Sequence, residues 1–380
     1  MNIAILGLGT VGFGVYDIIA NNDYFKGFLV TKVLEKDFNK KSLVKEYTTV
    51  VSNYDDILED KDISVIVETM GAKDFSYLCI KKALEKGKSV ITANKEVISV
   101  HLQELTKLKE ENSCSLYYEA SVGGGIPIIA PLFELVKINE VSKISGILNG
   151  TTNFILTKMF KEGISFTESI EEAKRKGFAE ADPTNDLEGL DMVRKISILS
   201  QIAYKAEIDI NDIYHFGITN INDNDVNNIK NLGLMLKLVA SSQIVDNNLS
   251  IQIEPVLIGK NNIFSSINYE NNIIEVLSNI NGPLSFIGKG AGRYPTANAI
   301  CNDLISIIES KKNYSFICKN KINVCPINIS GQYYIRLKDN ESISDDLIEF
   351  KRDTYLLTKT ISRKEFLEIF DKIVFYARIL

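Results

Sequence analysis

The first stretch of the chain switches from a strand-like to a helix-like pattern of apolar positions. Residues 2–6 form a short continuous apolar run, as buried parallel strands do. From Val11 to Ala20 the apolar residues recur at helical spacing, and a second strand-like stretch follows at Leu29 to Leu34. These three segments predict one βαβ unit.

The same alternation continues to about residue 120. The expected elements are a strand at 63–68, a helix at 76–86 that Gly87 ends, a strand at 89–93, a helix at 102–109 and a strand at 115–120. Strands that alternate with helices of this length favour a doubly wound parallel sheet. We therefore expect the α/β fold class, with a first domain over residues 1–128.

Beyond about residue 125 the pattern becomes that of an α+β domain, which we place at 129–289. The expected elements are helices at 128–137, 152–162, 166–176 and 187–204, and strands at 250–258, 273–278 and 284–287. Residues 220–231 hold six asparagines among twelve positions, and we interpret them as a polar loop.

The C-terminal part predicts a small α/β unit over residues 320–380. Residues 332–337 are strand-like, and residues 363–373 have helical spacing.

Composition and charge describe an ordinary globular protein. The chain has 380 residues, of which 45% are hydrophobic and 24% charged, values close to globular averages. Its length suggests more than one domain. The net charge of -6 gives no general attraction to nucleic-acid phosphates, so we expect no nucleic-acid partner.

The cysteines and the N-terminus bear on the cell compartment. The five cysteines form no C-x-x-C pair, and two histidines make a zinc set implausible. We interpret all five as reduced thiols: Cys79, Cys114, Cys301, Cys318 and Cys325. The N-terminus lacks a signal-peptide pattern, and no apolar run reaches the ~18 residues of a membrane helix. We expect a soluble cytoplasmic protein without a membrane partner.

A glycine motif stands between the first strand and the first helix. Residues 7–12, Gly-Leu-Gly-Thr-Val-Gly, fit G-x-G-x-x-G. The first glycine permits the tight turn, the second lets the backbone approach a pyrophosphate, and the third allows close helix-to-strand packing. The phosphates would lie at the helix N-terminus. This context predicts NAD or NADP binding by Gly7, Gly9, Thr10, Val11 and Gly12; a glycine-rich turn without a ligand is the alternative.

The end of the second strand leaves the choice of dinucleotide open. An acidic residue at this place hydrogen-bonds the ribose hydroxyls of NAD, whereas a basic residue accommodates the 2′-phosphate of NADP. Glu35 and Lys36 stand there side by side. A solvated charged turn is the alternative interpretation.

Two further places carry candidate chemistry. Lys95 follows a strand at the carboxyl edge of the expected sheet, where ligands bind in such folds. Residues 180–191 hold five carboxylates, which partly complement the dipole of the helix that follows. Asp191 and Lys195 lie one helical turn apart, on a face that continues through apolar residues. That alignment predicts a partly desolvated Asp–Lys pair beside a cleft, in which the carboxylate orients the ammonium.

The residue types that remain favour a lysine as the proton donor. Transfer of a hydride to a carbonyl requires a proton donor, and His101 and His215 each lie where a structural role is the simpler interpretation. No cysteine stands in a nucleophilic setting, which argues against oxidation of an aldehyde through an acyl-enzyme. We therefore expect interconversion of an alcohol with an aldehyde or ketone.

Several strings of residues resemble the homoserine dehydrogenase family over residues 1–310. They are Gly7 to Gly12, Glu68 to Gly71, Val90 to Glu96, Glu119 to Pro127, Gly146 to Asn153, Gly177 to Thr184 and Gly288 to Ala297. The resemblance implies reversible NAD(P)-dependent hydride transfer between L-homoserine and L-aspartate 4-semialdehyde, in the aspartate-derived pathway to threonine, methionine and isoleucine.

The resemblance also implies roles for individual residues. Lys195 matches the proton donor and acceptor, Asp191 its partner, and Lys95 the lysine near the nicotinamide and the reacting oxygen. The implied substrate-binding residues are Glu180, Asp186, Gly150 and Thr151. The implied cofactor contacts extend to Lys36, Thr69 and Gly290. A monovalent cation, usually sodium, is implied at Glu119, Val122, Gly124 and Ile126, held largely by backbone carbonyls.

At the level of domains, the resemblance implies that residues 290–312 complete the first domain. It implies that the second domain binds the substrate and forms a homodimer or a higher homo-oligomer. Lys36 stands where the family usually has an arginine that favours NADP, with Glu35 before it. Gln332 to Leu337 resemble the first strand of the family's regulatory ACT domain, in a shortened form. No kinase domain precedes the glycine motif, so we expect a monofunctional enzyme.

Two alternatives stay open at this point. The protein could be a dehydrogenase of another hydroxy amino acid, which a scan of substrates would identify. It could also be a catalytically silent dinucleotide-binding sensor, which would bind the cofactor without turnover.

Overall fold

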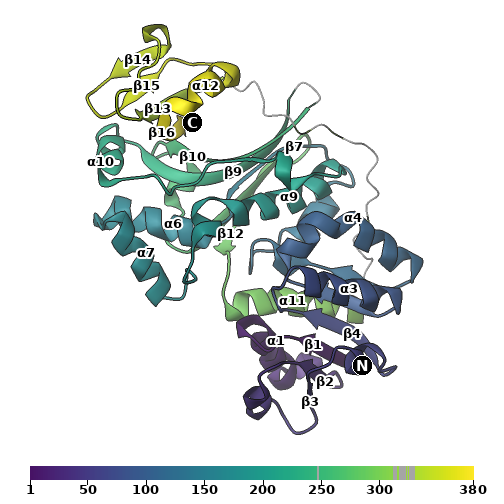
Figure 1. Ribbon diagram of the computed structural model, residues 1–380. Coiled ribbons are helices and arrows are strands. Elements are labelled where there is room, and N and C mark those ends of the chain that lie inside the picture. The colour runs from purple at the N-terminus through teal and green to yellow at the C-terminus, as the bar shows by residue number, and fades with distance from the viewer. Residues whose placement is uncertain (246–247, 311–314, 316–321, 323, 325–329) are drawn as a thin grey trace. The chain divides into compact units, whose positions relative to one another are not determined.

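The computed structural model describes residues 1–245, 248–310, 315, 322, 324 and 330–380, and it divides the chain into two compact units (Figure 1). Unit 1 comprises Met1–Asn139, Ser197–Glu207 and Gly288–Lys321, and unit 2 comprises Glu140–Ile196, Ile208–Ile287 and Ile322–Leu380. The boundary that we expected after residue 128 thus falls inside unit 1. The C-terminal residues that we expected as a separate unit belong to unit 2.

Unit 1 is built on a six-stranded sheet in which the hydrogen-bonded pairs are parallel. The strands are β1 (Asn2–Leu6), β2 (Leu29–Leu34), β3 (Thr49–Val51), β4 (Ile63–Glu68), β5 (Ser89–Thr92) and β6 (Leu116–Tyr117). Their order is β3-β2-β1-β4-β5-β6, so the direction of winding reverses between β1 and β4. Ligands of doubly wound sheets bind outside the carboxyl ends of the strands at this reversal, which is where the glycine motif lies. The expected doubly wound parallel sheet is confirmed.

The helices of unit 1 cover this sheet, and α11 packs beside α1 (Figure 1). They are α1 (Thr10–Asn21), α2 (Asp55–Leu58), α3 (Asp74–Glu85), α4 (Lys95–Glu111), α5 (Ile129–Leu135) and α11 (Arg293–Ile308). A Cβ on Gly14 would lie 2.9 Å from Arg293 Cγ and 3.1 Å from Ala297 Cβ, so α1 and α11 approach closely at this residue. Their apolar side chains share one core with the sheet, around Val15, Val67 and Ile300.

Strand β3 and the helices α2 and α11 were not predicted, and two predicted elements of unit 1 have clearly different bounds. Helix α4 begins at Lys95 rather than at residue 102, because Asn94 caps it by accepting a hydrogen bond from the Val97 N–H at 3.3 Å. The strand expected at 115–120 keeps only Leu116–Tyr117, and a short 3₁₀ helix follows at Glu119–Ser121.

Unit 2 is built on a sheet of ten strands, counted over the described residues. The strands are β7 (Val141–Ile147), β8 (Tyr214–His215), β9 (Met235–Val245), β10 (Asn248–Ile258), β11 (Asn271–Ser278), β12 (Gly282–Lys289), β13 (Gln332–Leu337), β14 (Ile348–Lys351), β15 (Leu356–Thr358) and β16 (Ile373–Ile379). The order is β12-β11-β7-β9-β10-β16-β13-β15-β14, with β8 paired to β10. Strands β7 and β9 were not predicted, although β9 pairs with β10 over its whole length.

The helices of unit 2 pack against this sheet. The helices are α6 (Gly150–Thr157), which continues as a π-helix at Lys158–Glu162, α7 (Phe166–Arg175), α8 (Thr184–Leu187), α9 (Leu190–Tyr204), α10 (Asp223–Asn231) and α12 (Arg363–Ile369). Of the expected capping box of α7, the first half is present, with the Ser165 hydroxyl accepting from the Glu168 N–H at 3.3 Å, while the Glu168 carboxylate accepts from the Ser165 hydroxyl at 3.2 Å. Ile198 and Ile202, on the expected apolar face of α9, are fully buried.

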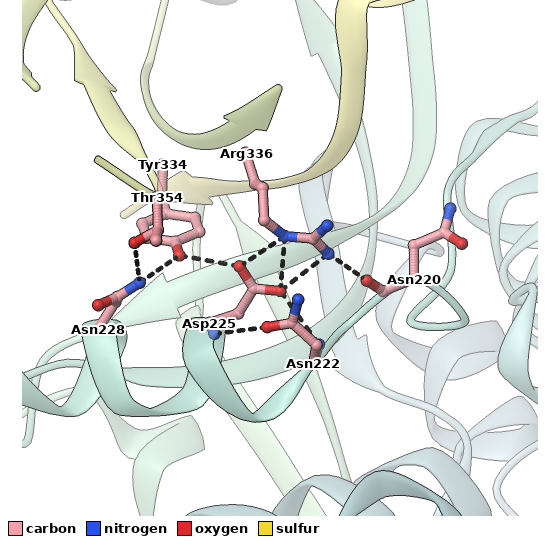
Figure 2. A network of polar contacts seen from close by, with 7 residues as sticks. All are labelled: Asn220, Asn222, Asp225, Asn228, Tyr334, Arg336 and Thr354. Carbon is pink, nitrogen blue, oxygen red and sulfur yellow. Dashed lines mark hydrogen bonds and ion pairs between the residues drawn. The ribbon is translucent and has the colours of Figure 1, made fainter. Parts of the chain in front are cut away.

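The asparagine-rich segment 220–231 is not a loop, and that prediction is wrong. Residues Asp223–Asn231 form α10, which begins with a capping box in which Asn222 and Asp225 exchange side-chain-to-backbone hydrogen bonds. The Asp225 carboxylate is fully buried and also accepts bonds from Arg336 at 3.1 Å and from the Tyr334 hydroxyl at 2.9 Å (Figure 2). Asp225, which we expected in a polar loop, therefore joins α10 to β13.

The C-terminal strands continue the sheet of unit 2. Strand β16 pairs in parallel with β10, at Val256 with Arg378 and at Leu257 with Ile379. Strand β13 has the bounds that the sequence predicted, and the helix expected at 363–373 is present as α12, which ends at Ile369. The C-terminal part therefore shares its hydrogen-bonded sheet with the middle of the chain.

Two further observations concern the thiols and the length of the helices. Cys79, Cys114 and Cys301 are buried thiols outside any disulfide, and Cys318 and Cys325 lie outside the described residues. Over the described residues, no helix combines the length and the apolar character needed to cross a bilayer.

Candidate active site

The glycine motif forms a tight turn between β1 and α1. Gly7 has a φ of +91°, a conformation that side-chain-bearing residues rarely adopt, and its N–H donates to the Leu34 carbonyl at 2.9 Å. A Cβ on Gly12 would lie 2.0 Å from the Gly7 carbonyl oxygen and 2.6 Å from Thr69 Oγ1, so only glycine fits there. Gly9 has open space around it, and it caps the N-terminus of the 12-residue helix α1. The turn therefore presents backbone N–H groups at an exposed helix start, as a pyrophosphate requires.

Glu35, at the end of β2, folds back onto this turn. Its Oε2 accepts from the Leu8 N–H at 3.1 Å and from Lys40 Nζ at 2.8 Å, and its Oε1 accepts from the N–H groups of Lys36 and Asp37. Partial burial would raise the pKa of Glu35, but the bonds from Lys40, Asp37 and Leu8 outweigh burial and hold this pKa below its ordinary value. An ionised carboxylate thus lies beside the second residue of the glycine turn, while the Lys36 side chain is exposed.

A buried carboxylate organises the ends of the two neighbouring strands. Glu68, the last residue of β4, accepts from the Met70 N–H at 2.8 Å and from the hydroxyls of Ser76 and Thr92 at 2.8 and 2.6 Å. Thr92 Oγ1 in turn accepts from the Asn94 N–H at 2.9 Å. These bonds tie the loop after β4 to the loop after β5.

Two predicted site residues lie on these loops. Thr69 donates to the carbonyl of Gly7 at 2.9 Å, which fixes it against the glycine turn. Lys95 is half-buried and is the first residue of α4, at the carboxyl edge of the sheet.

The predicted pair of Asp191 and Lys195 is present at the start of α9. Lys195 Nζ lies 2.7 Å from Asp191 Oδ2, and the two side chains are 11% and 7% exposed. The same ammonium donates to the Leu148 carbonyl at 2.8 Å. Two of the three hydrogens of the ammonium therefore point at these two oxygen acceptors. The pair is also largely shielded from water, as the sequence predicted.

Asn149 joins this pair to a second carboxylate, and the sequence reasoning did not include it. Its Nδ2 donates to Asp191 Oδ2 at 2.8 Å and to Asp186 Oδ1 at 2.7 Å. Burial raises the pKa of Asp186, the charge of Asp191 raises it further, and the bond from Asn149 opposes the rise. Asn149 also caps α6 by accepting from the Thr152 N–H at 2.8 Å. The available signal was an asparagine three residues before the helix expected at 152–162, because asparagine is a common helix cap.

The other predicted substrate residues lie at different distances from this cluster. Gly150 and Thr151 form the first turn of α6, directly after Asn149, and the Thr151 hydroxyl donates to the Phe178 carbonyl at 2.6 Å. Glu180 is exposed on the loop between α7 and α8, and its carboxylate takes no part in the hydrogen bonds described for the cluster.

The residues predicted to hold a cation form one buried segment of unit 1. The carboxylate of Glu119 accepts three backbone N–H groups, from Ile128, Ile129 and Ala130 at 2.6 to 2.8 Å. Burial raises the pKa of Glu119, and these three bonds oppose the rise. Since its carboxylate is occupied by these three N–H groups, Glu119 would bind a cation through its backbone carbonyl.

The rest of the cation segment supplies the same kind of donor. Gly124 has a φ of +57° and packs closely on Gly290, whose carbonyl oxygen would lie 2.4 Å from a Cβ on Gly124. Val122 and Ile126 are apolar and buried, so they too offer only backbone oxygen. The donor set fits a hard monovalent cation in kind. No group of three or more His, Cys, Asp or Glu side chains suited to a metal occurs in the described part of the chain.

The two histidines are engaged elsewhere, as expected. His101 stacks on Tyr77 with ring centroids 3.9 Å apart, and its Nδ1 lies 3.6 Å from Glu104. His215 lies exposed on β8, with Nδ1 3.5 Å from the Ile213 carbonyl.

Comparison with known proteins gives one consistent result. The family model described as homoserine dehydrogenase matches residues 127–305, and the model described as homoserine dehydrogenase, NAD binding domain, matches residues 7–119. The homoserine dehydrogenase of Bacillus subtilis is 36% identical over 374 residues, which cover 94% of this chain and 85% of that protein.

Solved structures agree with this result. The crystal structure of a homoserine dehydrogenase from Thiobacillus denitrificans has a TM-score of 0.89 and 26% identity, and the match covers 100% of this chain and 98% of that one. A hyperthermophilic archaeal homoserine dehydrogenase in complex with NADPH has a TM-score of 0.72 and 27% identity, over 83% of this chain and 99% of that one.

Proposed function

Since the chain belongs to the homoserine dehydrogenase family of oxidoreductases, which act on the alcohol group of homoserine, we propose that Asp191 and Lys195 carry its proton transfer. The observation that supports this most directly is the buried 2.7 Å pair at the start of α9. The alternative of a catalytically silent sensor has no comparable observation behind it.

Lys195 acts on the oxygen that the reaction converts between alcohol and carbonyl. The Leu148 carbonyl and Asp191 hold two of its hydrogens, so the third is directed at the substrate oxygen. Lys195 gives a proton to this oxygen when the aldehyde is reduced and accepts it when the alcohol is oxidised. Asp191 keeps the ammonium in place, and a bound nicotinamide dinucleotide supplies or accepts the hydride.

The substrate's amino group requires carboxylates nearby. Asp186 lies in the hydrogen-bonded cluster through Asn149, and we assign it to the substrate ammonium together with Glu180 on the neighbouring loop. The backbone of Gly150 and Thr151 borders the same cluster. Lys95 is assigned to the nicotinamide and the reacting oxygen in this proposal on the family resemblance alone.

The test of the activity is turnover of L-homoserine. The full chain is incubated with L-homoserine and NAD or NADP, and absorbance at the wavelength of the reduced cofactor is followed. We expect turnover with L-homoserine and much less with L-serine or L-threonine. Tight cofactor binding with no turnover of any hydroxy amino acid would favour the silent sensor, and turnover of a different hydroxy amino acid alone would reassign the substrate.

The dinucleotide is bound by the glycine turn in this proposal, with Thr69, Lys36 and Gly290 as further contacts. Glu35 then decides which dinucleotide is preferred, because its ionised carboxylate lies beside the turn and would repel a 2′-phosphate. The exposed Lys36 and the Lys40 partner of Glu35 attract the same phosphate and moderate this repulsion.

Glu35→Gln should therefore shift the ratio of the NADPH and NADH dissociation constants toward NADPH by about tenfold, which corresponds to ~1.4 kcal/mol. Fluorescence titration of both cofactors measures this ratio. Asp37→Asn is the matched control, since it removes an exposed carboxylate two residues away. An unchanged ratio in Glu35→Gln, or an equal shift in the control, would refute the role of Glu35.

Sodium bound by the backbone oxygens of Glu119, Val122, Gly124 and Ile126 and a homodimer or higher homo-oligomer stay predictions from the resemblance. A cytoplasmic location stays a prediction from the N-terminal sequence.

A further inference from the structure

A buried lysine outside the proposed proton-transfer pair connects three elements of unit 2. Lys237 lies in β9 and is 1% exposed. Its Nζ donates to Asn153 Oδ1 at 2.8 Å and to the Ile267 carbonyl at 2.5 Å. Asn153, in α6, donates in turn to the carbonyls of Ile267 and Asn271 at 3.2 and 3.0 Å. These bonds close a ring between β9, α6 and residues 267–271.

Residues 267–271 form a backing segment against both ends of α6. The carbonyl oxygen of Glu270 would lie 3.0 Å from a Cβ on Gly150, so the segment packs tightly on the first turn of α6. The Tyr269 N–H donates to Thr157 Oγ1 at 3.0 Å, at the last turn. Tyr269 has a φ of +57°, which costs backbone energy and requires the surrounding bonds to hold it.

The position of α6 sets the position of Asn149. Asn149 precedes the helix, and its carbonyl accepts from the Asn153 N–H at 3.4 Å, one turn away. The Asn149 side chain is the group that bonds to both Asp186 and Asp191. A displacement of the first turn of α6 would therefore move this amide out of reach of the two carboxylates.

We propose that Lys237 is a positioning residue for the substrate loop Asn149–Thr151, which it holds from two sides through Asn153 and through Ile267. This inference rests on the proposed function, because it assigns the loop to the amino-acid substrate. Lys237 touches neither the substrate nor the dinucleotide in this assignment, and it acts only through the hydrogen bonds that it donates.

The environment of Lys237 agrees with a role as a hydrogen-bond donor rather than as a charge. Burial lowers its pKa to about 7, and the neighbouring ammonium of Lys161 also lowers it. A neutral amine still carries two hydrogens, which match the two oxygen acceptors, Asn153 Oδ1 and the Ile267 carbonyl.

The test compares Lys237→Met with Lys143→Met. Methionine keeps the unbranched shape but removes the donors. Lys143 lies in β7, next to β9 in the same sheet, and lines a separate hollow with Glu275 and Arg378. The two variants therefore make the same lysine-to-methionine change at different places in one sheet. We expect Lys237→Met to raise KM for L-homoserine by about tenfold with a smaller fall in kcat, since misplacement by ~1 Å carries penalties of this order or larger. The dissociation constant of the dinucleotide should stay unchanged, and Lys143→Met should resemble the wild type.

Hydrogen exchange measured by mass spectrometry tests the same inference without turnover. Amides of residues 149–157 and 267–271 should exchange faster in Lys237→Met and at the wild-type rate in Lys143→Met. If the wild type shows no turnover, the proposed function fails while the exchange result still decides the positioning role. Lys237→Gln, which can donate to both oxygens, should have a KM between that of Lys237→Met and that of the wild type. Wild-type KM together with wild-type exchange in Lys237→Met would overturn the inference, as would failure of both variants to fold, which would make Lys237 a general structural residue.

Discussion

Lys195→Met should lower kcat for L-homoserine oxidation by about 10² to 10⁴, the range for loss of a positioned proton-transfer group. The methionine side chain reaches the same place but can neither donate nor accept the proton of the reacting oxygen. Steady-state kinetics with saturating cofactor measures the fall. Dinucleotide binding should be unaffected, because the glycine turn is intact and Lys195 is held by Asp191 and Leu148 instead.

The control for this prediction is Lys174→Met, which removes a lysine that is paired with Glu171 on the surface of α7. It should keep kcat within about twofold, because exposed pairs contribute little. The thermal transition of Lys195→Met must be recorded as well, since the change leaves the buried Asp191 without its cation. A folded Lys195→Met protein that keeps a tenth or more of the wild-type kcat would contradict the assignment.

Asp225→Ala should destabilise unit 2 by about 3 to 5 kcal/mol, the usual effect of breaking a buried ion pair by removing one partner. Asp225 is fully buried, and Arg336 donates to both of its oxygens while Tyr334 donates to one (Figure 2). Without the carboxylate, the tyrosine hydroxyl loses its acceptor, the guanidinium keeps the Asn220 carbonyl but no counter-charge, and α10 loses half of its capping box. Urea denaturation followed by circular dichroism measures the change in the free energy of unfolding.

Asp223→Ala provides the matched comparison, because Asp223 is an exposed acid in the first turn of the same helix. Its loss removes only a favourable interaction with the helix dipole, about 0.3 to 1 kcal/mol. Equal destabilisation by the two changes, or a loss under about 1 kcal/mol for Asp225→Ala, would show that the network in Figure 2 does not hold α10 to β13.

The elements that could be predicted from the sequence are those with a local pattern. The βαβ alternation predicts the parallel sheet of unit 1, and helical spacing predicts that Asp191 lies beside Lys195. Strand β9 was missed because Ser241, Ser242 and Gln243 interrupt its apolar run, although the strand pairs with β10 throughout. Helix α10 was missed because six asparagines hid the capping box that begins it.

The parts of the site that could not be predicted depend on contacts between residues far apart in the chain. Asn149 reaches Asp186 and Asp191 only once α6 and α9 are folded together, and Lys237 meets Asn153 across the sheet. Hydrophobic spacing carries no information about such pairs. A lysine between apolar residues, such as Lys237 between Leu236 and Leu238, was the remaining clue, because a buried amine requires partners.

The pairing of α1 with α11 has a consequence for the order in which the molecule can form. The helix that follows the glycine turn is made first, but Arg293 and Ala297, which pack against it at Gly14, are made only after two of the three segments of unit 2, Glu140–Ile196 and Ile208–Ile287. Strand β16, which lies between β10 and β13, comes later still. Because each of these contacts closes a long loop of chain, neither unit can complete its core during early synthesis. The dinucleotide turn therefore gains its partner helix only after residues 140–287 are made, and the sheet that supports the substrate loop is complete only after β16, so a nascent chain must keep its apolar faces from aggregating until then.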